Sequence, residues 1–137
     1  MSHLYFNDEN AIPNYLLEVL NECSNGVTLA DPSIDDLPLM YANDVFLKMT
    51  GYSVAEVIGK NCRFLQGSAT TSESTLKIRN SIANEQPDEV EIINYRKNGE
   101  IFINRLKIKP LYNDKGDLIY FLGIQNEIGK AQNSTKT

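Results

Sequence analysis

Residues 89–125 read EVEIINYRKNGEIFINRLKIKPLYNDKGDLIYFLGIQ and carry the clearest structural pattern in the chain. Apolar and polar side chains alternate along much of this stretch, which is typical of strands with one buried face. Two Asn- and Gly-containing turn sequences interrupt the alternation. The pattern predicts a meander of three antiparallel strands: Glu89–Tyr95, Ile101–Tyr112 and Leu118–Gln125.

Each of these strands carries one carboxamide on its apolar face, namely Asn94, Asn104 and Gln125. A buried amide must find hydrogen-bond partners or costs a few kcal/mol. In one interpretation the amides satisfy the backbone and one another. In the other, they bind a flat heterocycle with alternating N–H and C=O groups, because carboxamides both donate and accept.

The part before the meander predicts an amphipathic helix, two short strands and a group of short helices, in that order. The predicted elements are the helix Pro13–Ser24, the strands Val27–Ala30 and Leu39–Ala42, and helices at Asp44–Met49, from the N-cap Ser53, and at Ser72–Asn84. The apolar stripe of the first helix consists of Tyr15, Leu16, Val19, Leu20 and Cys23.

This order of elements predicts an α+β fold, and it divides the chain into three segments. Residues 1–25 form an N-terminal extension with the amphipathic helix, residues 26–126 form the domain, and residues 127–137 form a flexible C-terminal tail.

Length and composition indicate one soluble globular domain. The 137 residues are 42% hydrophobic and 23% charged, and the net charge of −5 argues against a general nucleic-acid or anionic-membrane binder. No membrane span or signal peptide is apparent, so we expect a cytoplasmic protein with two free thiols, Cys23 and Cys62. The single histidine, His3, leaves little basis for a metal site or a catalytic dyad.

A thiol lies among polar side chains in the stretch Gly59–Gly67, GKNCRFLQG. Asn61 and Arg63 flank Cys62, and Gln66 follows four residues later. Together with Arg79 on the predicted helix, Arg63 can clamp a terminal phosphate. The alternative is a pair of solvated surface arginines in an acidic protein. Cys23 is interpreted as a small hydrophobic residue of the helix stripe.

The stretch Gly59–Gly67 resembles the signature of LOV domains, the flavin-binding branch of the PAS superfamily. The resemblance extends over about residues 26–126 and includes Ile92–Tyr95, Asn104 and Tyr120–Gln125. It implies the PAS fold, a five-stranded antiparallel sheet with short helices on one face and an N-terminal cap helix. It also implies a blue-light photoreceptor, either a stand-alone short LOV protein or part of a larger receptor.

The same resemblance implies that flavin mononucleotide (FMN) is the cofactor and that Cys62 forms a reversible light-induced bond to flavin C4a. Such a module has no substrate or turnover and is not an enzyme. The implied polar contacts are Asn61 and Gln66 to the ribityl chain and flavin edge, Arg63 and Arg79 to the phosphate, and Asn94, Asn104 and Gln125 to the ring's polar edge. The implied apolar walls are Thr28, Leu65, Ile78, Ile82, Leu106, Ile108 and Phe121. Gln125 is also expected to relay the signal through the sheet and termini.

Two positions depart from the family pattern. Ala30 and Leu37 stand where many relatives carry Thr and Asn, so two polar contacts to the flavin are missing. We expect binding to persist, with effects on adduct lifetime and spectrum.

The expected partners are FMN and a second copy of the chain, with no direct nucleic acid and no membrane. A downstream effector is possible, but the sequence does not identify it. The outer strand faces and the helix stripe are the predicted dimer surface. The outer faces carry Ile101, Ile103, Tyr120, Leu122 and Ile124. The stripe covers either its own sheet or a partner.

Two alternatives belong to other function classes. One is a PAS module that binds a different ligand or serves only as a dimerisation scaffold, which a colourless, flavin-free protein would favour. The other is a flavin redox enzyme. Against it stand the lack of a second nearby redox cysteine, of a histidine base and of a dinucleotide-binding glycine fingerprint.

Overall fold

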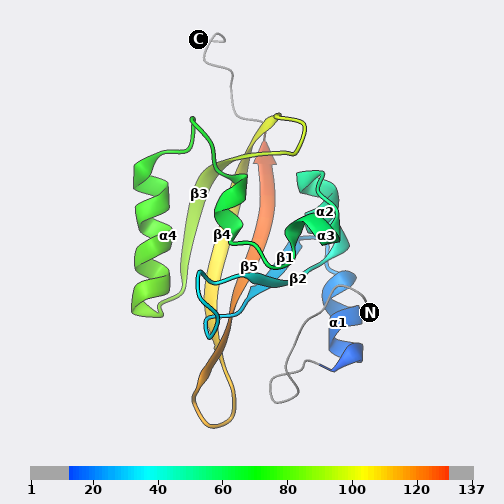
Figure 1. Ribbon diagram of the computed structural model, residues 1–137, viewed down its shortest axis with the longest axis vertical. Helices are drawn as coiled ribbons and strands as arrows, with labels where there is room; N and C mark the ends of the chain where they lie inside the picture. Colours follow the sequence, from blue (N-terminus) through cyan, green and yellow to red (C-terminus); the bar gives the residue numbers. More distant parts are fainter. Residues whose placement is uncertain (1–12, 130–137) are drawn as a thin grey trace.

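The computed structural model describes residues 13–129, which form a five-stranded antiparallel sheet flanked by helices (Figure 1). The strand order is β2-β1-β5-β4-β3, and the predicted α+β PAS fold is confirmed. The elements are α1 (Asn14–Asn21), β1 (Gly26–Ala30), β2 (Leu39–Ala42), α2 (Asp44–Thr50), α3 (Val54–Val57), the 3-10 helix η2 (Cys62–Leu65), α4 (Ser72–Asn84), β3 (Asp88–Tyr95), β4 (Ile101–Tyr112) and β5 (Leu118–Gly129).

The meander forms as predicted, but its last strand is longer. The prediction that the strand ends at Gln125 and that a tail begins at residue 127 is wrong, because β5 continues to Gly129. Pairing with β4 continues there, with Asn104 opposite Glu127. The Arg96 guanidinium holds this polar extension, with its Nη2 2.7 Å from the Glu127 carboxylate. Residues 1–12 and 130–137 lie outside the described part.

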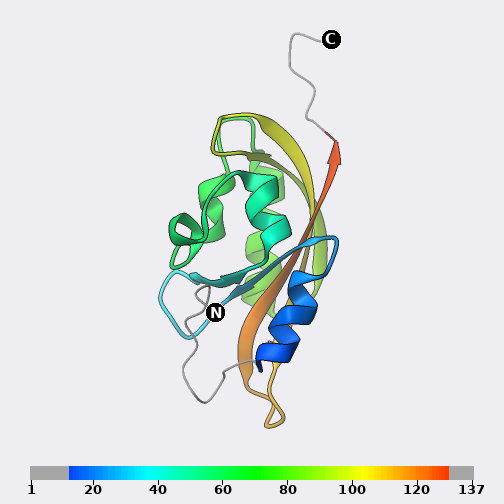
Figure 2. The ribbon, with the colours of Figure 1, turned by 90° about the vertical axis from the view of Figure 1, so that its right-hand side faces the viewer.

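The helices lie on both faces of the sheet (Figure 2). On the inner face, α2, α3, η2 and α4 pack against the sheet in a core that includes Phe46, Val57 and Leu65. On the outer face, α1 packs on the chain's own sheet through Leu17, which contacts a cluster that includes Tyr120. Among the described helices, only those of the inner layer pack on the sheet face that carries the three carboxamides.

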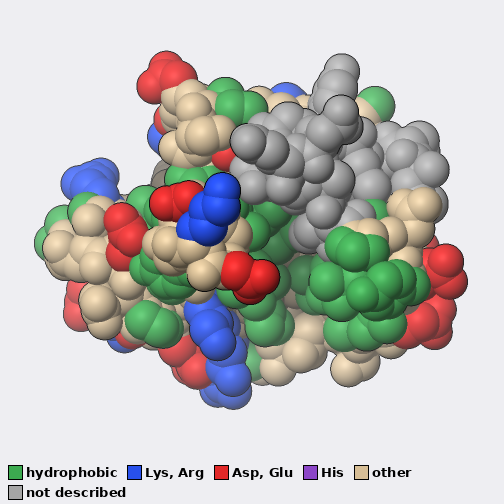
Figure 3. Space-filling view, turned by 90° about the horizontal axis from the view of Figure 1, so that it is seen from below, with side chains coloured by type: hydrophobic (Ala, Val, Ile, Leu, Met, Phe, Trp, Pro, Cys, Tyr) green, Lys and Arg blue, Asp and Glu red, His purple; other side chains and the backbone are tan. Residues whose placement is uncertain are grey.

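Only part of the predicted apolar stripe of α1 is buried. Leu20 and Cys23 pack against the outer-face cluster, but the deepest contact is Leu17, and Tyr15 and Val19 are 72% and 56% exposed. The short helix presents only one narrow line of contact to the sheet, so its other apolar side chains face outward. From below, hydrophobic side chains gather on the side where α1 lies (Figure 3).

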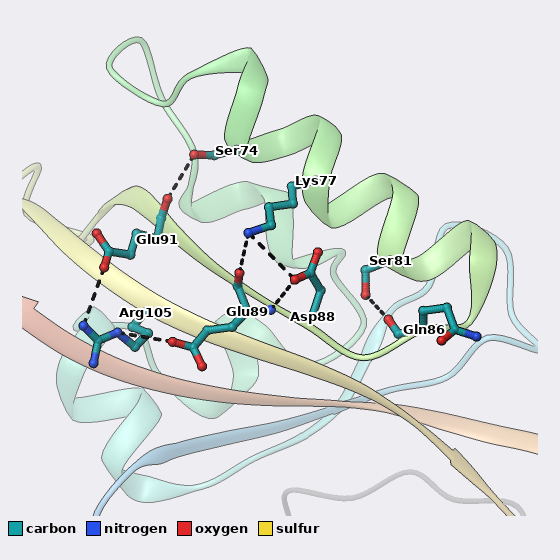
Figure 4. Close-up of polar contacts among 8 residues, drawn as sticks. All are labelled: Ser74, Lys77, Ser81, Gln86, Asp88, Glu89, Glu91 and Arg105. Carbon is teal, nitrogen blue, oxygen red and sulfur yellow. Dashed lines mark hydrogen bonds and ion pairs between the residues drawn. The ribbon is translucent and has the colours of Figure 1, made fainter.

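The outer sheet face is less open than the sequence pattern predicts. Tyr120 is 2% exposed because α1 covers it, while Ile103 and Leu122 are half-buried. Towards β3 the same sheet carries charge, since Arg105 Nη2 lies 3.5 Å from the Glu91 carboxylate (Figure 4). The predicted dimer through this face is not tested by a single chain and stays a prediction.

Side chains of α4 bond the backbone of the edge strand β3 (Figure 4). Ser74 Oγ donates to the carbonyl oxygen of Glu91 at 3.0 Å, and Lys77 Nζ donates to that of Glu89 at 2.9 Å. These carbonyls belong to alternate residues, so they point to the same side of the strand. The bonds hold α4 beside the sheet, over the inner face.

Asn43 joins three elements from a fully buried position. Its Oδ1 accepts from the backbone N–H of Val27 at 2.8 Å and of Phe46 at 3.0 Å, the latter as the N-cap of α2. Its Nδ2 donates to the carbonyl oxygens of Leu20 and Asn25, each at 3.0 Å. One amide thus ties the end of α1 and the start of β1 to α2.

We expect Asn43→Ala to lower the free energy of unfolding by about 2–4 kcal/mol, because buried backbone groups lose their partners together with the cap. Denaturant unfolding of the full chain measures the change. Asn80→Ala, on the exposed side of α4, is the control and should change stability by about 0.5 kcal/mol or less. Similar values for both variants would contradict the role of Asn43.

Candidate functional site

The one-turn helix η2 presents Cys62 towards the inner face of the sheet. Asn61 caps it, with Oδ1 accepting from the Arg63 N–H at 2.9 Å. Leu65, 1% exposed, anchors its other end in the core. The sequence pattern predicts no helix here, and the only local signal is an Asn at the N-cap position.

Two adjoining cavities lie between the inner helices and the sheet. The inner cavity is about 100 Å³ and the outer one, open to solvent, about 870 Å³. Together they are within the size range of small-molecule sites. The residues that border both are Leu37, Asn61, Arg63, Gln66, Ile78 and Ile82.

Most of the predicted site residues border these cavities. The predicted residues that border only the inner cavity are Cys62, Asn94, Asn104, Leu106 and Gln125. The predicted residues that border both cavities are Asn61, Arg63, Gln66, Ile78 and Ile82. Arg79 and Phe121 border the outer one. Ile92, Ala30 and Leu37 also border the inner cavity. No wall role was predicted for Ile92, although strand alternation places it on the same face as Asn94.

Three predicted wall residues lie behind this lining. Thr28, Leu65 and Ile108 are buried, and neither cavity reaches them. Leu65 and Ile108 belong to the inner core. The hydroxyl of Thr28 instead accepts a hydrogen bond from Gln125. These residues support the lining, and a direct contact from them to a ligand stays a prediction.

The three carboxamides meet on one face, as strand alternation predicts, but their bonding differs. Asn104 Nδ2 donates to Asn94 Oδ1 at 3.0 Å, and Asn104 Oδ1 accepts from the Asn126 N–H at 3.2 Å. These two amides therefore bond to one another and to the backbone, as expected from the interpretation in which the amides need no ligand.

Gln125 is the exception. Its Nε2 donates to Thr28 Oγ1 at 3.2 Å, but its Oε1 has no partner among the described residues although the side chain is 1% exposed. A buried acceptor left unpaired costs about 1–3 kcal/mol. Because Gln125 borders the inner cavity, a ligand with an N–H group there would remove this cost.

Gly123 makes room for this arrangement. A Cβ at position 123 would lie 2.6 Å from Thr28 Oγ1 and 3.0 Å from Gln125 Nε2. Any side chain would therefore displace the hydroxyl and the amide from each other. The absence of a side chain here allows Gln125 to lie along the sheet.

Cys62 borders the inner cavity as a neutral thiol. Burial raises the pKa of this thiol to about 12, so it remains protonated near neutral pH. The thiolate is the form that attacks an ordinary electrophile. Cys62 is consequently unreactive unless a partner in the cavity takes its proton.

The two arginines of the outer cavity are unequal. Arg63 is held by Asp36 through two bonds, Nη1–Oδ2 at 2.8 Å and Nη2–Oδ1 at 2.6 Å. The hydrogen bonds from Arg63 hold the pKa of the Asp36 carboxyl below its usual value. Arg79 is exposed on α4, and no carboxylate within residues 13–129 pairs with it.

Other kinds of site find little support in the described part of the chain. No group of His, Cys, Asp and Glu side chains there is arranged to hold a metal ion. Cys23 and Cys62 are both free thiols, as expected. Between residues 13 and 129, no helix combines the length and apolar character needed to cross a bilayer.

Comparisons with known proteins point to one family. A family model described as a PAS domain matches residues 24–130. A Rhizobium johnstonii protein named blue-light-activated histidine kinase is 48% identical over 99 residues, which are 72% of this chain and 29% of that protein. The chain thus spans under a third of this relative.

Solved structures agree. The LOV domain of a blue-light-activated histidine kinase from Erythrobacter litoralis has a TM-score of 0.76 and 42% identity, covering 80% of this chain and all of that one. A light-oxygen-voltage domain from a flavin-analogue study has a TM-score of 0.79 and 37% identity, covering 84% and 85%.

We expect the dark-state alkylation of Cys62 by iodoacetamide to keep rising with pH up to about pH 10, because its raised pKa keeps the thiolate scarce throughout. Near about pH 8 its rate should be about tenfold or more below that of free cysteine. Mass spectrometry of Cys23→Ser, which leaves Cys62 as the single thiol, measures it. A plateau below about pH 9 would indicate an ordinary thiol.

Proposed function

Since this chain belongs to the PAS domain family and, within it, to the LOV blue-light photoreceptors, we propose that it binds FMN and bonds Cys62 to the flavin reversibly under blue light. The observation that carries the proposal is that Cys62 borders the same inner cavity as Gln125, a buried amide whose Oε1 has no partner among the described residues. Bound FMN would supply the absorption of blue light and the flavin carbon C4a to which a sulfur can bond.

The lining residues divide between ring and tail. Asn94, Asn104 and Gln125 hold the polar edge of the ring, while Ile78, Ile82 and Leu106 enclose it; Phe121 borders the outer cavity. Asn61 and Gln66, which border both cavities, hold the ribityl chain between them. Arg63 and Arg79 then lie at the open end, where charge-assisted bonds suit a phosphate.

Cys62 contributes by position and protonation state. A neutral thiol does not react in the dark, which suits a sensor that must remain silent without light. Bound flavin would supply, in its light-excited state, both the acceptor for this thiol proton and the carbon to which the Cys62 sulfur would bond, and the reverse transfers in the dark would restore the neutral thiol. The cavity supplies proximity and keeps water away from the reacting sulfur.

Gln125 relays the change to the sheet. A ligand atom that gains a proton changes from acceptor to donor, and the amide of Gln125 would turn so that its unpaired Oε1 accepts from that atom. Gln125 lies in β5, four residues before the end of the strand at Gly129. A reorientation there alters the pairing of β5 and the chain that leaves it.

The module is a sensor without turnover, and its output lies elsewhere. We propose that the effector is a further segment or a partner protein, as the name of the Rhizobium relative suggests. The same proposal assigns the protein to the cytoplasm and gives it neither a nucleic acid nor a membrane as a direct partner. A second copy of the chain is the proposed cover for the exposed side of α1, where Tyr15, Leu16 and Val19 lie.

We expect Cys62→Ala to keep FMN bound but to lose the reversible loss of flavin absorbance under blue light, and to fluoresce more strongly. Absorption and fluorescence before and after illumination measure both. Cys23→Ala is the matched control, because Cys23 packs on the outer face, away from the cavity. Bleaching and dark recovery of Cys62→Ala like that of the parent would exclude Cys62. A colourless parent would favour a PAS scaffold instead.

We expect Gln125→Leu to form the Cys62 bond with absorption shifted to shorter wavelength, yet to lose most of the light-induced structural change. Hydrogen exchange in the dark and under light measures this change in β5. Gln66→Leu removes another cavity amide from outside the sheet, and should keep the change. If Gln125→Leu responds as fully as the parent, another residue relays the signal.

A further inference from the structure

The mouth of the outer cavity carries acidic as well as basic side chains. Arg63 and Arg79 border it, but Asp35 and Asp36 border it too. The four formal charges cancel, so the mouth has no net positive charge to attract an anion. Selection of a phosphate there must therefore depend on which guanidinium is free.

The Asp36 carboxylate is held in place by more than the ion pair. The backbone at Asp36 is left-handed, with φ of 67°, and its carbonyl oxygen accepts from Asn61 Nδ2 at 2.7 Å. Aspartate and asparagine tolerate this conformation better than most residues. The loop therefore presents the carboxylate to Arg63 in one orientation, and both terminal nitrogens of the guanidinium are engaged.

We propose that Asp36 is a specificity-determining residue that competes with the flavin phosphate for Arg63 and so weakens the preference for FMN over riboflavin. This inference rests on the proposed flavin binding, and goes beyond it by assigning a role to an acidic residue. The phosphate of FMN must displace the carboxylate or share the guanidinium with it. Riboflavin has no phosphate and leaves the pair intact.

The pair is weak enough to exchange. Both side chains are more than half exposed, at 59% and 58%, and exposed ion pairs contribute little net stability. The simpler alternative is that the pair only holds the loop of residues 31–38 closed. In that case its loss would change the affinities for FMN and riboflavin equally.

The test measures dissociation constants of FMN and riboflavin in the dark, by quenching of flavin fluorescence on binding to flavin-free full chain at low salt. We expect Asp36→Asn, which keeps the shape and tolerates the backbone, to tighten FMN about fivefold, or roughly 1 kcal/mol. Riboflavin should change by less than about twofold. Added salt should narrow the difference between variant and parent.

Asp35→Asn is the matched control, because it removes the same charge from the neighbouring position without breaking the pair with Arg63. Its FMN affinity should rise by less than about twofold. In an Arg63→Gln background, Asp36→Asn should no longer improve FMN binding. Asp36→Gly, which also accepts a left-handed backbone, repeats the test without the side chain.

Three outcomes overturn the inference. Equal changes for FMN and riboflavin mean that Asp36 only shapes the loop. Equal effects of Asp35→Asn and Asp36→Asn on FMN affinity mean that the total negative charge at the mouth of the cavity weakens FMN binding. The ion pair of Asp36 with Arg63 then has no effect of its own. Binding of neither flavin by the parent or by any variant overturns the proposed function and this inference with it, whereas the first two outcomes overturn the inference alone.

Discussion

The register of the antiparallel sheet is the constraint on which the rest of this domain depends. A shift of one residue between β4 and β5 would turn every side chain of one strand to the opposite face. Asn104 helps to fix that register, because its Oδ1 accepts from the Asn126 N–H beside an irregularity in the pairing at Ile103/Asn104. The side chain that borders the cavity thus also specifies where the strands meet.

Much of the fold and the site follows from local rules. Period-two alternation in residues 89–125 is enough to place Asn94, Asn104 and Gln125 on one face, because each strand has only two faces. Ser53 is the N-cap of α3 as predicted, and it forms a capping box with the backbone and side chain of Glu56. The cofactor and the role of the thiol, by contrast, are implied only by the family resemblance, since alternation alone leaves both a ligand and mutual pairing of the amides open.

What sequence reasoning missed depends on contacts between distant segments. The pairing of Asp36 with Arg63 joins positions 27 residues apart through a left-handed loop, and no periodicity encodes it. The burial of Leu17 was missed because a short helix offers several apolar faces, and the sheet beneath it decides which one is used. The extension of β5 to Gly129 depends on Arg96, whose bond to Glu127 compensates for the polar character of these residues.

The bonds between α4 and β3 have a consequence for solubility. An edge strand exposes a row of unpaired backbone groups, which can template a strand from another molecule and start aggregation. In β3 the carbonyls of Glu89 and Glu91 already accept from Lys77 and Ser74. The helix that borders both cavities therefore also blocks sheet extension at this edge.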